Sequence, residues 1–143
     1  MAGRLNHLAV FVCAVAFFIW GAVWYTLLFG GMYQNLAGHG QSSAGNMAPQ
    51  LIITFVMGWV LSYVTAIALR DSDNPNPVRH GIEFGVFFGV GIYATMTLIN
   101  YAYDQRPYAL WAINAGYVVT GMAIIGAIIG AWQKKPVTAT TTT

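Results

Sequence analysis

Long uncharged stretches dominate the pattern of hydrophobic and polar positions along the chain. No Asp, Glu, Lys or Arg occurs from Leu5 to Leu69, from Phe84 to Tyr103 or from Pro107 to Gln133. A helix needs about 20 apolar residues to cross the hydrocarbon core of a bilayer. The first stretch is too long for one crossing, and polar residues interrupt it between Gln34 and Asn46. The pattern therefore predicts four membrane-spanning helices.

We place these helices at residues 8–29, 49–69, 81–101 and 108–132. The alternating polarity of a membrane β-barrel is absent, and a helix satisfies its own backbone hydrogen bonds in lipid. The predicted fold is therefore all-α, a four-helix transmembrane bundle that forms one domain over residues 1–137. A Thr-rich tail follows at residues 138–143.

Composition narrows the class of protein. Hydrophobic residues make up 57% of the 143 residues and charged residues 7%, where a soluble domain has about 25% charged residues. These values exclude a disordered chain, a nucleic-acid binder with a basic patch and an ordinary soluble enzyme. The single cysteine, Cys13, supports no intrachain disulfide.

The basic residues predict an orientation in the membrane. Cytoplasmic loops carry an excess of Lys and Arg. With four spans, Arg106 falls on one side and the other five basic residues fall on the opposite side: Arg4, Arg70, Arg79, Lys134 and Lys135. We therefore expect both termini in the cytoplasm.

Few residues in the spans carry ionisable chemistry. Glu83 lies four residues after Arg79, the spacing of a helical ion pair, and we interpret the two as an interfacial pair. A proton-relay role for Glu83 is the alternative, because a carboxylate within a membrane helix often has a function. His7 and His80 lie at cytoplasmic helix ends without a metal-ligand spacing around them, so we predict no metal site and no cofactor.

Small residues recur at the spacing that lets membrane helices approach closely. Gly81, Gly85 and Gly89 share one face of the third predicted helix, and Gly126 and Gly130 share one face of the fourth. These faces pack either inside the bundle or against a partner subunit or second copy.

Aromatic and amide side chains cluster near the helix ends. Aromatic belts mark the lipid headgroup level, and we assign this role to Trp24, Tyr25, Tyr108, Trp111 and Trp132. Asn100 and Asn114 lie on neighbouring helices that a short turn joins. A buried amide needs a partner in lipid, so we expect these two residues to form interhelical hydrogen bonds, to each other, to Thr97 or Tyr117, or to backbone carbonyls.

Two sequence elements carry a resemblance to a known family. The first is Gly21-Ala22-Val23-Trp24-Tyr25 followed by Phe29-Gly30, and the second is Gly126-Ala127-Ile128-Ile129-Gly130-Ala131-Trp132. With the apolar runs around them, they resemble the bacterial four-helix membrane proteins of domain-of-unknown-function family 1761. The resemblance covers residues from about Asn6 to Trp132 and implies a bacterial inner-membrane location. The family supplies no activity to transfer.

We expect the protein to serve as a structural or accessory subunit of a larger membrane complex. Its partners would be the lipid bilayer and other membrane subunits or copies of itself, and not nucleic acid. A small-solute transporter or channel component is the alternative. An enzyme is not expected, because no acid–base pair, nucleophile–base pair or metal set occurs in the spans.

Overall fold

The described part of the protein is helical. The computed structural model describes residues 5–37 and 48–132, so the predicted Thr-rich tail and most of the first loop lie outside it. Within these ranges, four helical stretches are long and apolar enough to cross a membrane: His7–Leu28, Ala48–Leu69, Pro77–Tyr103 and Tyr108–Ala131. The prediction of four long apolar helices is confirmed, with most ends within a residue or two.

Two of the four stretches change their helical geometry part-way. The elements in chain order are α1 (His7–Ala22), η1 (Val23–Leu28), α2 (Gly30–Ala37), α3 (Ala48–Leu69), α4 (Pro77–Phe88), η3 (Gly89–Ala94), α5 (Thr95–Tyr103) and α6 (Tyr108–Ala131). Both η1 and η3 are π-helical, with wider turns than an α-helix. The first span is therefore α1 continued by η1, and the third is α4, η3 and α5 in sequence.

Local sequence explains where the helices begin. The Asn6 side chain accepts a hydrogen bond from the backbone N–H of Ala9 at 3.2 Å, and Asn76 accepts one from Arg79 at 3.3 Å. Pro77 follows Asn76 at a first-turn position, where its missing N–H costs nothing. This cap starts α4 four residues before the position that the hydropathy pattern predicts.

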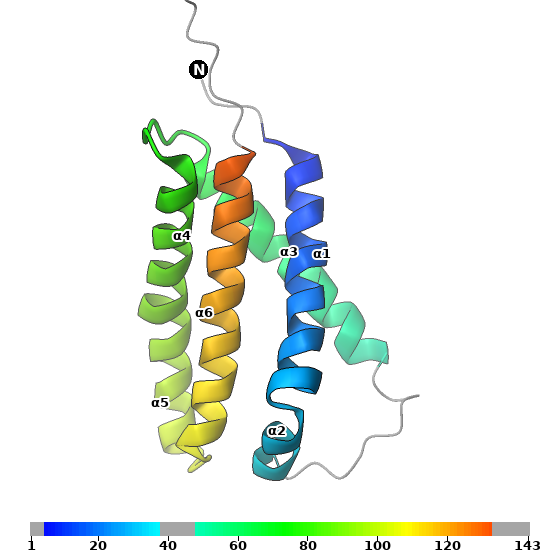
Figure 1. Ribbon diagram of the computed structural model, residues 1–143. Coiled ribbons are helices and arrows are strands. Elements are labelled where there is room, and N and C mark those ends of the chain that lie inside the picture. Colours follow the sequence, from blue (N-terminus) through cyan, green and yellow to red (C-terminus); the bar gives the residue numbers. More distant parts are fainter. Residues whose placement is uncertain (1–4, 38–47, 133–143) are drawn as a thin grey trace, which may run out of the picture.

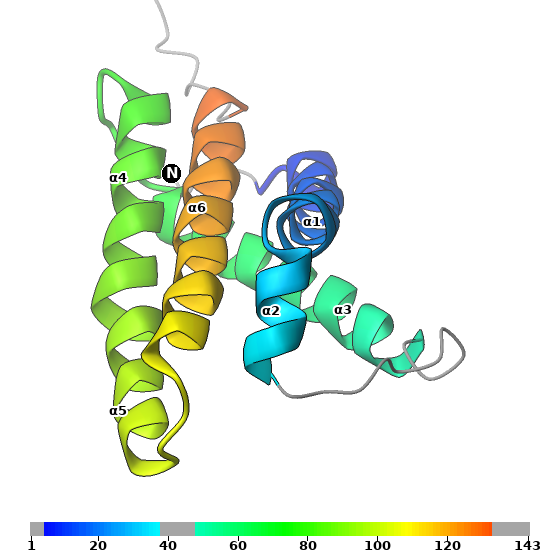
Figure 2. The same cartoon turned by 60° about the horizontal axis from the view of Figure 1, so that its bottom comes forward.

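One predicted loop is partly helical. The sequence pattern predicts a loop for the polar stretch after the first span, but Gly30–Ala37 forms α2. The backbone bends at Phe29, whose φ of −126° lies outside the helical region, and α2 turns away from the direction of η1 (Figure 2).

α6 lies at the centre of the bundle. It stands between α1 on one side and α4 with α5 on the other (Figure 1), and half of its most apolar 18-residue window is buried, against 17% for the third span. α3 crosses the other helices at an angle and packs mainly against α1. We name the two ends of the bundle after their turns: the α5–α6 end at residues 104–107 and the α3–α4 end at residues 70–76.

The core joins α1 to α6. Val10 and Cys13 on α1 and Ile125 on α6 are fully buried, and Phe17 packs against the Tyr117 ring with centroids 5.0 Å apart. The most buried apolar residues of the first and fourth spans thus face each other along the bundle.

Candidate functional site

A hydrogen-bonded network near the α5–α6 end connects three of the four spans. The Tyr25 hydroxyl donates to Asn114 Oδ1 at 2.6 Å, and Asn114 Nδ2 donates to the Tyr101 hydroxyl at 2.7 Å. Tyr25 belongs to η1, Asn114 to α6 and Tyr101 to α5. Both polar atoms of the amide are therefore bonded, and one side chain fixes the distance between the ends of three helices.

Indole groups add further links at the same level. Trp24 Nε1 donates to the carbonyl oxygen of Ile113 at 3.0 Å, and Trp111 Nε1 donates to the carbonyl oxygen of Ala94 at 3.0 Å. With Asn114, these bonds place four consecutive residues of α6, residues 111–114, between η1 and η3. We call residues 111–114 the bridging segment.

Aromatic rings surround the network. The Tyr25 ring meets the rings of Tyr33 and Tyr117 edge-on, with centroids 4.8 Å and 5.1 Å away. Tyr33 lies on α2, so the ring cluster also connects that short helix to the bundle. Edge-to-face pairs of this kind stabilise by about 0.5–1.5 kcal/mol beyond their buried area.

The network carries hydrogen bonds and no formal charge. A tyrosine hydroxyl and an asparagine amide donate and accept hydrogen bonds but supply no acid–base pair near neutral pH. Within the described ranges, 5–37 and 48–132, no three His, Cys, Asp or Glu residues gather closely enough to hold a metal ion. The arrangement suits binding or the positioning of helices.

The predicted small-residue faces lie between α4 and α6. A Cβ atom on Gly81 would overlap the carbonyl oxygen of Gly126, and a Cβ on Gly85 would overlap the carbonyl of Met122. Gly130 packs in the same way against the backbone of Pro77. Gly89 is less tight, since a Cβ atom there would lie 2.9 Å from Val119 Cα. The glycine faces are therefore covered by the chain's own helices.

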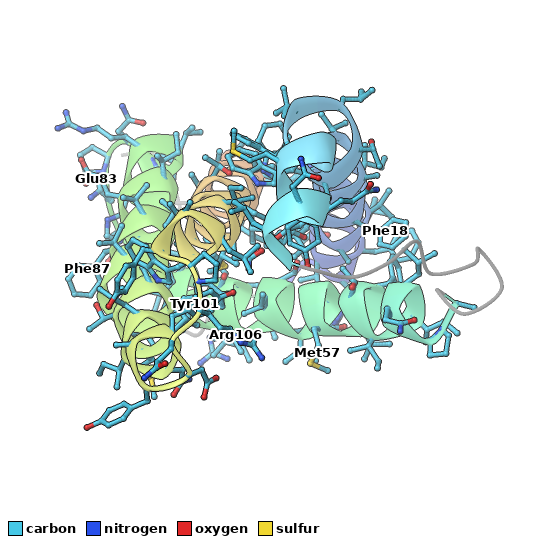
Figure 3. The ribbon with its side chains drawn as sticks, turned by 90° about the horizontal axis from the view of Figure 1, so that it is seen from below. Phe18, Met57, Glu83, Phe87, Tyr101 and Arg106 are labelled. Carbon is cyan, nitrogen blue, oxygen red and sulfur yellow. The ribbon has the colours of Figure 1, made fainter. Side chains whose placement is uncertain are left out.

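The predicted ion pair is present in the structure. Arg79 Nε donates to Glu83 Oε1 at 2.8 Å, and both side chains are exposed. Figure 3 shows Glu83 and Phe87 pointing away from α4 on its outer side. Neither residue belongs to the Tyr25–Asn114–Tyr101 network. His7, at the start of α1, is hydrogen-bonded to the Tyr63 hydroxyl at 2.9 Å.

The two predicted amides differ in their surroundings. Asn114 makes interhelical bonds, but to tyrosines and not to Asn100. Asn100 is exposed, and among the described residues no side chain bonds to its amide. An interhelical role for Asn100 thus has no contact to support it.

The five residues assigned to the aromatic belt also differ. Tyr108 and Trp132 are exposed, as a position among lipid headgroups requires. Trp24, Tyr25 and Trp111 are partly buried, and their polar atoms bond to other helices. These three side chains are cross-links within the bundle.

Comparison with known protein families gives a match for this chain. The family described as "Protein of unknown function (DUF1761)" matches residues 8–130, which include nearly all of the four spans. The chain belongs to this family. No curated protein and no solved structure gave a match.

The DUF1761 match includes every residue of the polar network, although sequence reasoning identifies only part of it. The partners expected for Asn114 are Asn100, Thr97, Tyr117 or backbone carbonyls, and Tyr25 and Tyr101 are not among them. The sequence signal that could identify the network is the depth of its polar residues within the predicted spans. Asn114 lies six residues into its span, about 9 Å from the start at 1.5 Å per residue, and Tyr25 lies within a turn of the end of the first span.

Proposed function

We propose that this DUF1761 protein is an accessory subunit of the bacterial inner membrane, without catalytic activity, that packs laterally against the helices of a partner subunit. Its four spans cross the bilayer with both termini in the cytoplasm. The observation that carries the proposal is an apolar hollow on the side of the bundle, where α3 crosses α1.

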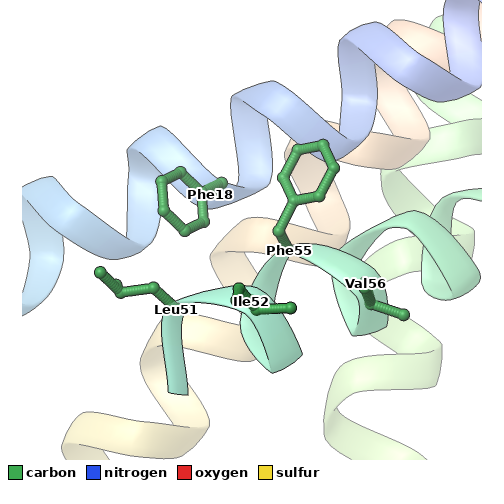
Figure 4. A pocket seen from close by; sticks show the side chains of 5 residues that line it. All are labelled: Phe18, Leu51, Ile52, Phe55 and Val56. Atoms are coloured by element: carbon green, nitrogen blue, oxygen red, sulfur yellow. The ribbon is translucent and has the colours of Figure 1, made fainter. Parts of the chain in front are cut away.

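The hollow has a volume of about 280 Å³ and is open to the side. Phe18 from α1 and four residues of α3 line it: Leu51, Ile52, Phe55 and Val56 (Figure 4). All five lie in the spans, so the hollow faces the bilayer interior when the protein is inserted.

Aromatic contacts hold the walls of the hollow in place. The Phe55 ring meets the Phe18 ring and the Trp59 ring edge-on, with centroids 6.0 Å away in each case. A partner helix that seats a side chain in this shallow recess gains van der Waals contacts, and helix association in lipid depends on such packing and not on hydrophobicity. A side chain from a partner helix would make contacts that a mobile acyl chain makes only transiently.

The charged residues support a non-catalytic role. Each ion pair of the described residues lies near a helix end and joins residues no more than four positions apart: Arg70 with Asp71, Arg79 with Glu83, and Arg106 with Asp104. Among the described residues the carboxylates do not gather into one cluster, and the charge beside the network is the Arg106 guanidinium, which lies 5.8 Å over the centre of the Tyr101 ring.

Filling the hollow tests the proposal. Ile52→Trp places a large ring at its edge, and Val60→Trp, on an exposed position of the same helix outside the hollow, is the matched control. After extraction in a mild detergent, we expect the wild type and Val60→Trp to co-purify with one partner in a fixed ratio, and Ile52→Trp to lose it while keeping its own thermal stability. A monodisperse protein without a partner from native membranes would refute the accessory role.

Cysteine accessibility tests the orientation. In a Cys13→Ala background, Tyr103→Cys reports on the α5–α6 end and Ser72→Cys on the α3–α4 end. With cytoplasmic termini, an impermeant maleimide added to whole cells should label position 103 and not position 72. The reverse pattern would overturn the orientation.

A transporter of small solutes is the second candidate, and the polar network favours it. The Tyr101 hydroxyl hydrogen has no acceptor among the described residues, so the network has a donor available for a solute. If the protein transports a solute through this network, Asn114→Leu should abolish flux in liposomes. If Glu83 instead relays protons, Glu83→Gln should abolish proton-coupled flux. Equal flux in the wild type and in both variants would remove these residues from a transport mechanism.

A further inference from the structure

Both π-helical segments lie beside the bridging segment of α6. In η1, the backbone N–H of Phe29 bonds to the carbonyl oxygen of Trp24, five residues back, at 2.9 Å. The second π-helical segment, η3, covers Gly89–Ala94, and at its end the Thr95 side chain donates to the carbonyl oxygen of Val90 at 3.0 Å. A π-helical turn is rare and amounts to one extra residue inserted in an α-helix.

The bridging segment bonds to both π-helical segments, η1 and η3, from one side. Trp111 donates to the carbonyl of Ala94 in η3, and Asn114 accepts from Tyr25 in η1. The same amide donates to Tyr101 on α5, beyond η3. Three residues of the bridging segment, Trp111, Ile113 and Asn114, therefore bond to the places where the first and third spans depart from α-helical geometry.

The part of the third span that precedes η3 is held rigidly against α6. On α4, the backbone at Gly81 and Gly85 is in direct contact with the backbone of α6, so neither helix can rotate without separating from the other. Beyond η3 the helices are joined mainly by long side chains, such as Tyr101 and Trp111. The bundle thus has a closely packed α3–α4 end and an α5–α6 end held by side-chain bonds.

We propose that η1 and η3 are two coupled joints latched by the bridging segment. When the Asn114 bonds break, the wide turns convert to α-helical turns, and the segments beyond them, α2 and α5, rotate against the fixed α3–α4 end. When a π-helical turn becomes α-helical, the extra residue joins the regular helix, and the helix beyond it rotates by about 100°. Tyr101 then faces away from Asn114, so the latch bonds exist in one position of the joint only. This inference does not depend on the proposed partner.

Distance measurements between spin labels test the joint. In a Cys13→Ala background in lipid nanodiscs, one label pair at Met32 and Tyr103 spans both joints, and a second pair at Leu8 and Phe87 lies on their fixed side. All four positions are exposed. A 100° rotation on a helix of about 5 Å radius moves a side chain by about 8 Å. We expect Asn114→Ala to add a second distance, shifted by several ångströms, to the first pair and to leave the second pair unchanged.

Two further variants distinguish release of the latch from a general disturbance of the fold. Asn100→Ala removes an exposed amide with no side-chain partner among the described residues, and both label pairs should keep their wild-type distances. If Asn114→Ala does not fold, Tyr101→Phe removes one latch hydroxyl with little change of shape, and it should shift the first pair alone. An unchanged first pair in the folded latch variant, or equal broadening of both pairs, would overturn the proposal.

Discussion

The glycines of the third span provide a graded test of how closely α4 and α6 pack. At Gly81 an added methyl group meets the backbone of Gly126, which cannot move aside as a side chain can. At Gly91, two residues after Gly89, an added methyl group meets nothing within 4 Å. The same substitution, Gly to Ala, should therefore have opposite effects at the two positions.

The expected changes in the free energy of unfolding follow from two effects, helix propensity and overpacking. Ala is favoured over Gly within a helix by about 1 kcal/mol, and overpacking a tight contact costs about 1–3 kcal/mol. Gly91→Ala should gain helix propensity without any overpacking and stabilise the protein by roughly 0.5–1 kcal/mol. Gly81→Ala should lose about 2 kcal/mol net, because its methyl group meets backbone atoms that must separate, which places the overpacking cost at the top of this range, about 3 kcal/mol. Gly89→Ala should lose about 1 kcal/mol, less than Gly81→Ala, since its methyl group would lie 2.9 Å from the backbone Cα of Val119 and needs a smaller separation of the helices.

Unfolding in mixed micelles with increasing dodecyl sulfate, followed by circular dichroism, measures these differences. The gap between Gly81→Ala and Gly91→Ala should be about 3 kcal/mol, or about a hundredfold in the unfolding equilibrium. The contacts require that the Gly91→Ala variant is the most stable, followed by Gly89→Ala and then Gly81→Ala. Equal stability of the Gly81→Ala and Gly91→Ala variants would show that α4 and α6 do not approach closely at Gly81.

The remaining predictions concern single side chains. Asn114→Leu should destabilise the protein by about 1–2 kcal/mol in the same assay, because two tyrosine hydroxyls lose their partner, while Asn100→Leu should have no effect beyond error. Glu83→Gln should change stability by less than about 1 kcal/mol, since its pair with Arg79 is exposed, and a larger loss would mean that the pair is buried in an assembly. Cys13 is fully buried, so a maleimide should label it slowly in the folded protein and rapidly after unfolding; equal rates would contradict its position in the core.

Hydropathy predicts the spans well because the requirement for length and apolarity acts on each helix separately. The predicted ranges 49–69 and 108–132 differ from α3 and α6 by one residue at one end each. The start of α4 differs by four residues because the composition of residues 70–79 is typical of a turn. Asn76 and Pro77 are common turn residues, but the same pair is a helix cap followed by a first-turn proline.

The details of the polar network are harder to predict. One extra residue in a wide turn leaves the average hydropathy of a span unchanged, so η1 and η3 have no signature in the apolar pattern. Trp24 and Tyr25 fit an aromatic belt by position and composition. Only the rotation of the helix decides whether such a side chain faces lipid headgroups or bonds to a neighbouring helix, and the wide turn in η1 alters that rotation.

The central place of α6 has a consequence for biosynthesis. A ribosome delivers this helix after α1, α3 and α4, all of which contact it in the finished bundle. The turn at 104–107 is too short to let α5 and α6 enter the membrane far apart, so they arrive as a pair. Until then, the earlier helices lack the surface that seats them and are exposed to quality-control proteases. Nascent chains that stop before residue 108 should accordingly be degraded rapidly, whatever the strength of their own apolar segments.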